Sequence, residues 1–203
     1  MNESSVVGGS VRILLGGGIG AGKSIAGCRF AFHGFVVVEA DRLGHEVLEP
    51  GGAVFGDVAQ RWPTVLVDGR IDRSLLAAIV FSDADLLAEL EAMTHPHIVS
   101  RIEEIGRRSD RVVVEVPVLL DPAGDWFKVY VAAPRSVRRE RAILRGSASM
   151  DVEQRMDRQA AHESWTGWAD AIITNDGTLD DLDRAVDALC ARLQSAGGER
   201  TSS

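Results

Sequence analysis

The sequence predicts an α/β fold in which a five-stranded parallel sheet carries helices on both faces. Short apolar runs alternate along the chain with segments of helical spacing, and the runs are apolar at consecutive positions. Strands of that kind are buried on both faces, which is typical of a parallel sheet between two helical layers. With 203 residues, 45% of them hydrophobic, the chain has the size of one domain with insertions.

Each element follows from a local pattern. Strands are predicted where apolar and β-branched residues run together between glycines, prolines or polar residues, at 11–15, 35–38, 112–116, 127–132 and 171–174. Helices are predicted where apolar residues recur at helical spacing, at 24–33, 134–145, 149–163 and 179–193. The ends, residues 1–10 and 195–203, are rich in Gly, Ser, Asn and Glu and are predicted to be disordered tails around a domain at 11–194.

The segment between the second and third strands is far longer than a usual crossover. Residues 42–108 have helical spacing, with breaks at Pro50, at Trp62-Pro63 and at His95-Pro96. A crossover needs only about a dozen residues, so this segment is predicted to be a helical insertion over one end of the sheet. Folds of this class place a second substrate at that end, which makes the insertion the candidate acceptor-binding region.

The composition excludes several classes of function. A formal net charge of -8 argues against a sequence-independent grip on nucleic acid, which needs clustered positive charge. No run of 18 apolar residues is present, and the first ten residues lack the pattern of a secretory signal. Cys28 and Cys190 lie far apart, without the spacing of a metal site. The expected protein is cytoplasmic, a monomer or weak homo-oligomer, with neither nucleic acid nor membrane as a partner.

The loop after the first strand carries the clearest chemical signal. Residues 17–24 fit G-x-x-x-x-G-K-[ST] at every fixed position, between a predicted strand and a predicted helix. Glycines let backbone N–H groups surround a phosphate, and the helix N-terminus favours the anion. Lys23 supplies an ammonium for the β- and γ-phosphates, and Ser24 a hydroxyl ligand for Mg²⁺, with water or the carboxylate of Glu115 beside it. The predicted ATP-binding residues of this loop are Gly17, Gly18, Gly20, Ala21, Gly22, Lys23, Ser24 and Ile25.

Arginines cluster after the fourth strand. Seven occur between residues 135 and 158 of an otherwise acidic chain, and most are expected on a solvated helix face. Arg141 and Arg145, spaced i and i+4, share one helix face and are candidates for contact with a transferring phosphate. Small-molecule kinases of this fold class close a mobile, arginine-bearing lid, which is predicted here at about 141–165.

Taken in order, these motifs resemble the dephospho-CoA kinase family from about residue 11 to residue 193. The matching segments are 17–24, 37–41, 68–73 with 80–81, 95–98, 117–121, 141–145 with Gln159, and 169–177. The resemblance implies a three-layer P-loop kinase fold with a helical acceptor-binding insertion and a small helical lid. It implies ATP and Mg²⁺ as cofactors, and phosphorylation of the ribose 3′-hydroxyl of dephospho-CoA to give CoA and ADP, the last step of coenzyme A biosynthesis.

The resemblance also implies roles for single residues. Asp41 matches the acidic position proposed as the base for the acceptor hydroxyl, and Asn175 lies beside the adenine. The implied catalytic set is Asp41, Lys23, Arg141 and Arg145, and the implied acceptor-binding set is Asp41, Arg73, His95 and Pro117. Structural interpretations stay open at this point, because Asp41 and Asp72 also suit helix N-caps and His95-Pro96 also suits a helix start.

The chain departs from the family pattern at several positions. Ile25 replaces a threonine, Glu39 an aspartate and Asp121 a glutamate, while His162 and Trp165 stand where the lid is often basic. Fewer lid cations weaken charge stabilisation in the transition state. Two alternatives therefore remain. One is a related P-loop kinase for another nucleotide or nucleoside-like acceptor, and the other is a low-activity or non-catalytic nucleotide-binding homologue.

Overall fold

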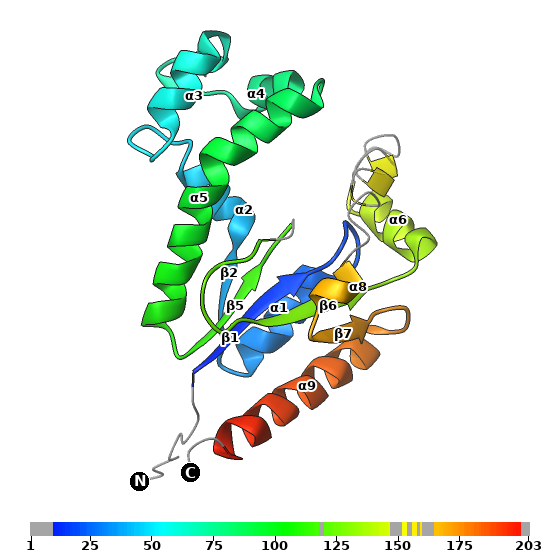
Figure 1. The fold of residues 1–203 in the computed structure, drawn as a ribbon. Coiled ribbons are helices and arrows are strands. Elements are labelled where there is room, and N and C mark those ends of the chain that lie inside the picture. Colours follow the sequence, from blue (N-terminus) through cyan, green and yellow to red (C-terminus); the bar gives the residue numbers. More distant parts are fainter. Residues whose placement is uncertain are drawn as a thin grey trace. The chain divides into compact units, whose positions relative to one another are not determined.

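The computed structural model describes residues 10–117, 120–146, 152–153, 156–157, 159 and 165–199 (Figure 1). The chain divides into two compact units. The first unit consists of residues 1–38, 106–119 and 123–203 and contains the large sheet. The second consists of residues 39–105 and 120–122, and so contains most of the insertion predicted at 42–108.

Five strands form the sheet of the first unit in the order β2-β5-β1-β6-β7. Their bounds are β1 (Val11–Gly16), β2 (Val36–Glu39), β5 (Arg111–Glu115), β6 (Phe127–Ala132) and β7 (Ala171–Thr174). β1 pairs in parallel with β5 and β6, and β6 with β7. The register places Leu15 opposite Glu115, so this carboxylate stands beside the end of β1, where the glycine-rich loop begins. The predicted five-stranded parallel sheet is confirmed.

The central strands β1 and β5 are buried on both faces of the sheet. α1 (Lys23–Phe32) and α9 (Leu179–Glu199) pack against each other along one face (Figure 1). Ile13 and Leu15 of β1 join the core cluster that includes residues of these two helices. Leu14 lies between them, and because side chains alternate along a strand it faces the other side, where it is also fully buried. Consecutive burial of this kind is what the unbroken apolar runs predict.

Among the helices whose bounds the structure describes, the first unit also contains α6 (Arg135–Leu144), α8 (Trp165–Trp168) and the end of α5. The helix predicted at 149–163 lies largely outside the described residues, as does the tail predicted at 1–10. α9 continues to Glu199, so residues 195–199 are helical and not the start of a disordered tail. The apolar periodicity of α9 ends near Leu193, and the helix extends past it on backbone hydrogen bonds.

The second unit is mainly helical and has its own core. Its elements are α2 (Ala40–Glu46), α3 (Phe55–Arg61), the 3-10 helix η1 (Pro63–Val65), β3 (Leu66–Val67), β4 (Arg70–Ile71), α4 (Arg73–Val80) and α5 (Ala84–Arg108), the last of which ends in the first unit. α3, η1, β4 and α4 together bury one cluster of side chains, made of Val54, Val58, Trp62, Val65, Ile71, Leu76 and Val80.

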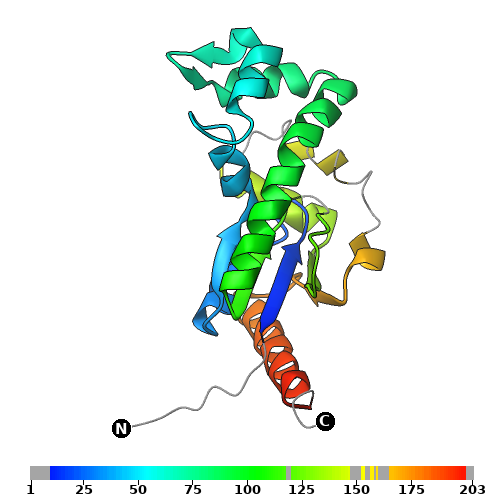
Figure 2. The ribbon, with the colours of Figure 1, turned by 60° about the vertical axis from the view of Figure 1, so that its left-hand side comes forward.

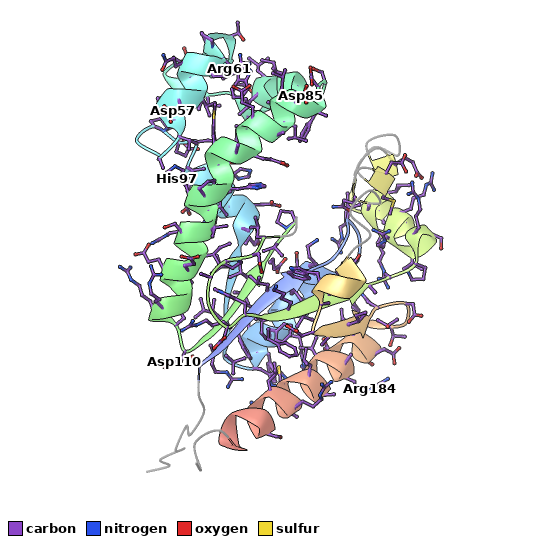
Figure 3. All side chains as sticks on the ribbon, in the orientation of Figure 1. Asp57, Arg61, Asp85, His97, Asp110 and Arg184 are labelled. Atoms are coloured by element: carbon purple, nitrogen blue, oxygen red, sulfur yellow. The ribbon has the colours of Figure 1, made fainter. Side chains whose placement is uncertain are left out.

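Two predictions within this unit are wrong. Residues 66–71 form an antiparallel hairpin instead of helix, because Asp68 and Gly69 both adopt the positive φ that a tight hairpin turn requires (49° and 75°). His95-Pro96 does not interrupt a helix, and α5 runs through both residues as one continuous helix (Figure 2). Buried Ile98 and Ile102 anchor α5 beyond the proline, so packing offsets the single hydrogen bond that proline removes. Figure 3 labels His97 on this uninterrupted part of α5.

Candidate active site

The loop between β1 and α1 is shaped by glycines at positions that other residues cannot occupy. Gly20 and Gly22 have φ of 73° and 102°, and Gly22 is the N-cap of α1. A Cβ on Gly20 would overlap the backbone of Arg138, and a Cβ on Gly22 would overlap the side-chain amide of Asn175. The loop is therefore enclosed by α6 on one side and by the residues after β7 on the other, with α1 beginning directly behind it.

Lys23 is the first residue of α1, and its ammonium folds back over this loop. Nζ donates a hydrogen bond to the carbonyl oxygen of Gly17 at 2.5 Å. A second turn of the loop is closed by the Ala21 N–H, which donates to the Gly18 carbonyl at 3.0 Å. A compact cation thus lies against the concave backbone of the loop, the arrangement that receives the β- and γ-phosphates of a nucleotide.

Ser24 and Glu115 bring two oxygen ligands together beside Lys23. Ser24 Oγ donates to Glu115 Oε2 at 3.1 Å, and only 8% of Glu115 is exposed. A hydroxyl and a carboxylate are the ligand types that suit Mg²⁺, which takes few protein ligands and completes its shell with phosphates and water. Within the described part of the chain, no group of three or more His, Cys, Asp or Glu side chains is placed to hold a metal ion. The pair of oxygens beside the loop therefore fits a cation that arrives with a nucleotide.

Asn175, which follows β7, and Arg141 of α6 form a series of hydrogen bonds that ends on the glycine-rich loop. Asn175 follows β7, is 3% exposed, and donates from Nδ2 to the Ala21 carbonyl at 2.7 Å. Arg141 of α6 donates to the Asn175 carbonyl at 2.9 Å and to the Gly177 carbonyl at 3.5 Å. These bonds connect α6, the end of β7 and the glycine-rich loop in one chain of contacts.

Comparison with known proteins decides the family. The family model described as "Dephospho-CoA kinase" matches residues 11–181. The chain belongs to the dephospho-CoA kinase family. It is therefore a kinase of coenzyme A biosynthesis, in which this family performs the last step.

Individual relatives cover nearly all of the chain. The dephospho-CoA kinase of Thermobifida fusca (strain YX) is 36% identical over 91% of this chain and 96% of its own length. The crystal structure of TT1252 from Thermus thermophilus is 31% identical, covers 90% of this chain and 98% of its own, and has a TM-score of 0.73. The dephospho-CoA kinase from Campylobacter jejuni, at 21% identity and TM-score 0.60, shares the fold over 91% of this chain and 98% of its own.

The two arginines that the sequence singles out in this kinase lie in different surroundings. Arg141 is committed to the two backbone carbonyls of Asn175 and Gly177. Arg145 is the C-cap of α6 and is exposed, and its side chain makes no ion pair or hydrogen bond with another described residue. Their contact with a transferring phosphate stays a prediction. Arg135 and Arg139 bond to Glu153, holding the pKa of that carboxyl below its ordinary value, in line with the solvated face expected for most of this run.

Arg138 of α6 and Gln159 of the lid pattern contact the glycine-rich loop, although neither was predicted as a site residue. The guanidinium of Arg138 lies directly over Gly18, where a Cβ would overlap it. Gln159 Oε1 accepts a hydrogen bond from the Ile19 N–H at 2.8 Å. Gln159 is part of the lid pattern and Arg138 lies one turn before Arg141, but no spacing rule links either residue to a loop more than a hundred positions away.

The residues expected to bind the acceptor occupy separate elements. Asp41, Arg73 and His95 belong to α2, α4 and α5 of the second unit, and no hydrogen bond or ion pair joins them in the described part of the chain. The capping interpretation of Asp41 is wrong, because the N-cap of α2 is Glu39 and Asp41 stands in the first turn. The capping interpretation of Asp72 is confirmed, since its carboxylate accepts from the backbone N–H of Ser74 and of Leu75.

Pro117 follows β5 in the first unit and is half-buried. Ile25 packs against the core cluster under the sheet, so the departure from a hydroxyl residue adds an apolar contact. His162 and the side chain of Trp165 lie outside the described residues. No helix in the described part of the kinase has the length and apolar character needed to cross a membrane.

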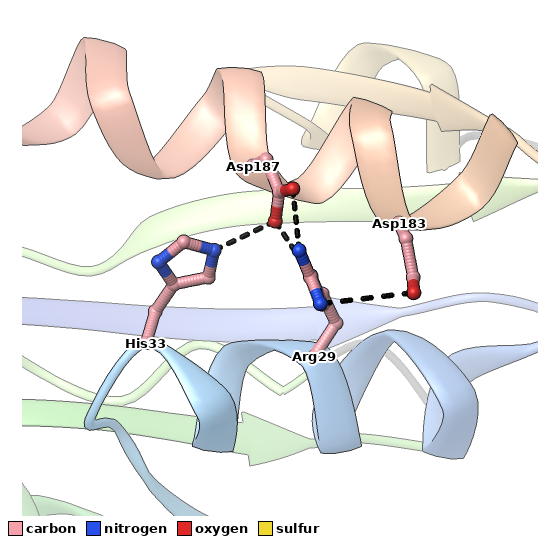
Figure 4. Close-up of polar contacts among 4 residues, drawn as sticks. All are labelled: Arg29, His33, Asp183 and Asp187. Carbon is pink, nitrogen blue, oxygen red and sulfur yellow. Dashed lines mark hydrogen bonds and ion pairs between the residues drawn. The ribbon is translucent and has the colours of Figure 1, made fainter. Parts of the chain in front are cut away.

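A charged clamp holds α1, the helix that presents Lys23 and Ser24, against α9. Arg29 donates through two nitrogens to the Asp187 carboxylate, each at 2.6 Å, and His33 Nε2 lies 2.7 Å from the same carboxylate (Figure 4). Asp183 adds a longer ion pair to Arg29 at 3.8 Å. Hydrogen bonds from Arg29 and then from His33 hold the pKa of Asp187 well below its ordinary range.

Proposed function

We propose that this kinase transfers the γ-phosphoryl group of ATP to the 3′-hydroxyl of the ribose of dephospho-CoA, giving CoA and ADP. The observation that carries the proposal is the glycine-rich loop at 17–24, with its lysine ammonium and its serine–glutamate oxygen pair, in a member of this family. In the reaction the acceptor O–H bond breaks, a new O–P bond forms, and the bond from the γ-phosphorus to the bridging oxygen of ADP breaks.

The ATP end of the site is assigned to the first unit. The backbone N–H groups of residues 17–22 and the start of α1 hold the phosphates, and Lys23 neutralises charge on the β- and γ-oxygens. Ser24 and Glu115 would hold Mg²⁺, which would draw electron density from the phosphate oxygens. Asn175 and Arg141 keep the Ala21 carbonyl in place, so that the loop presents its N–H groups inward.

The acceptor end is assigned to Asp41, Arg73, His95 and Pro117 on the strength of the family resemblance. Asp41 accepts the proton of the attacking hydroxyl, and late proton transfer suffices because the transition state of phosphoryl transfer is loose. Arg145 supplies positive charge from the lid. We place the enzyme in the cytoplasm, where ATP is available and where cysteines such as Cys28 and Cys190, both free in this structure, remain reduced.

A coupled assay of ADP release tests the proposal. We expect release with dephospho-CoA and little or none with a panel of other nucleosides, nucleotides and sugar alcohols, and ³¹P NMR of the product should place the new phosphate on the 3′-oxygen. Preference for another acceptor in the panel would replace dephospho-CoA as the substrate. Tight ATP binding without ADP release for any acceptor would indicate a non-catalytic nucleotide-binding protein.

The variant Asp41→Asn tests the proton acceptor in the same assay. Asparagine keeps the size of the side chain and removes its basicity, so we expect kcat to fall by about 10²–10⁴-fold. The melting temperature and ATP affinity should stay unchanged, because Asp41 is not the N-cap of α2 and asparagine has the same size. A near-normal kcat would remove Asp41 from the proposed chemistry while leaving the choice of substrate intact.

A further inference from the structure

Gly27 stands in the interior of α1, where glycine is among the least favourable residues. Its φ is not positive, so the backbone conformation does not require glycine at this position. It is also buried. The reason for a glycine here must therefore lie in what occupies the space beside it.

That space is occupied by the carboxylate of Glu115. A Cβ added to Gly27 would lie closer than 3.0 Å to Glu115 Oε1, nearer than real Cβ atoms approach, and 3.4 Å from Glu115 Cδ. The third of the three nearest atoms is Val37 Cγ1, at 3.4 Å, which is an ordinary van der Waals distance. Glu115 Oε1 thus occupies the space in which a side chain at position 27 would begin.

The two oxygens of Glu115 have different surroundings. Oε1 faces the bare backbone of Gly27, whereas Oε2 accepts the hydrogen bond from Ser24 Oγ at 3.1 Å. The residue is 8% exposed and sits at the end of β5, opposite Leu15 of β1. Oε1 and Oε2 belong to one planar carboxylate, so a group that takes the place of Oε1 also shifts Oε2 relative to Ser24.

We propose that Gly27 is a positioning residue: the absence of its side chain sets the place of the Glu115 carboxylate beside Ser24, and through it the place of the divalent cation that accompanies ATP. The inference rests on the proposed function to the extent that a cation binds at Ser24. Gly27 and Glu115 then act as a pair, in which the longer carboxylate requires the smaller helix residue. An Ala at 27 is compatible with a carboxylate one methylene shorter.

Four proteins test the pair: wild type, Gly27→Ala, Glu115→Asp and the double variant. The probe is Mn²⁺ binding to each protein with the non-hydrolysable ATP analogue AMP-PNP, followed by electron paramagnetic resonance. We expect Gly27→Ala to weaken Mn²⁺ binding by about 10–100-fold, the usual effect of disturbing a group that orients a metal ligand. AMP-PNP affinity without metal should change less than about twofold, and the double variant should bind Mn²⁺ more tightly than Gly27→Ala alone.

Melting temperatures without metal or nucleotide separate positioning from folding. Alanine is the better helix former, so we expect Gly27→Ala to melt at or above the wild-type temperature while losing Mn²⁺ affinity. Gly56→Ala is the matched control, because Gly56 lies in α3 with nothing within 4 Å of an added Cβ, and its Mn²⁺ affinity should equal that of wild type.

Three results would overturn the inference. The first is an unchanged Mn²⁺ affinity in Gly27→Ala, and the second is a double variant whose fold-loss of Mn²⁺ affinity equals the product of the fold-losses of the two single variants. The third is a metal-free melting temperature of Gly27→Ala far below that of wild type. Failure of the proposed function is a separate result. If the protein binds Mn²⁺ and AMP-PNP but does not phosphorylate dephospho-CoA, the proposed substrate is wrong. The Mn²⁺ affinities of the four proteins still test the coupling between Gly27 and Glu115 in that case.

Discussion

Removal of the Asn175 side chain should reveal how much the glycine-rich loop depends on a single buried hydrogen bond. Asn175 Nδ2 donates to the Ala21 carbonyl at 2.7 Å, and the two residues are 3% and 0% exposed. In Asn175→Ala this carbonyl has lost its donor in a place that excludes water. An unsatisfied buried acceptor costs about 1–3 kcal/mol.

The void left by the carboxamide adds about 1 kcal/mol, so the free energy of unfolding should fall by about 2–4 kcal/mol. That is a large share of the stability of a typical domain, which is about 5–15 kcal/mol. Asn175→Asp should be worse near neutral pH, because a carboxylate oxygen then faces the carbonyl oxygen where an N–H stood. Part of that loss should return as the pH falls and the new carboxyl group gains a proton that it can donate.

Urea denaturation gives the stability, and titration with AMP-PNP gives the state of the loop. We expect nucleotide affinity to fall together with stability, because the Ala21 carbonyl is free to turn into the phosphate-binding space. Asp176→Ala, at the exposed neighbouring position, is the control and should stay within about 0.5 kcal/mol of wild type. A loss below about 0.5 kcal/mol in Asn175→Ala, with nucleotide affinity intact, would refute the reasoning.

Three further predictions concern charged groups. Lys23→Ala should abolish phosphoryl transfer, because removal of the ammonium over the loop costs several kcal/mol of charge stabilisation. Circular dichroism should show an intact fold. Wild-type turnover by this variant would contradict the assignment of the site. Arg141→Ala should lower both the melting temperature and kcat because its guanidinium bonds two backbone carbonyls, whereas Arg145→Ala should lower kcat alone, and the reverse pattern would exchange their roles. Asp187 has a lowered pKa in the folded state, so its carboxylate stabilises the fold above the unfolded-state pKa of about 3.9, and this contribution declines as the pH falls further. The melting-temperature difference between wild type and Asp187→Asn should be full at pH 7 and should shrink below about pH 4; a difference that stays constant down to pH 3 would contradict the clamp.

The sequence by itself determined the parallel sheet and the phosphate-binding loop, because both depend on local patterns. Five runs of consecutive apolar residues predict the five strands, of which β1 and β5 are buried on both faces, and β1 ends where the glycines begin. The loop needs small residues at positive φ, which Gly20 and Gly22 supply, and a cation at the first position of the following helix, which Lys23 supplies. The apolar runs, the loop glycines and Lys23 are all patterns among residues that are close together in the sequence.

Only the tertiary structure decided which distant side chains complete the site. Ser24 meets Glu115 because β5 pairs beside β1, and no spacing between positions 24 and 115 encodes that order of strands. Gly27 has the pattern of an ordinary core-facing helix residue until Glu115 is seen beside it. Arg138 and Gln159 contact the loop for the same reason. Contacts between segments far apart in the chain depend on how the layers pack, because the free energy of burying apolar surface does not depend on the sequence positions of the partners.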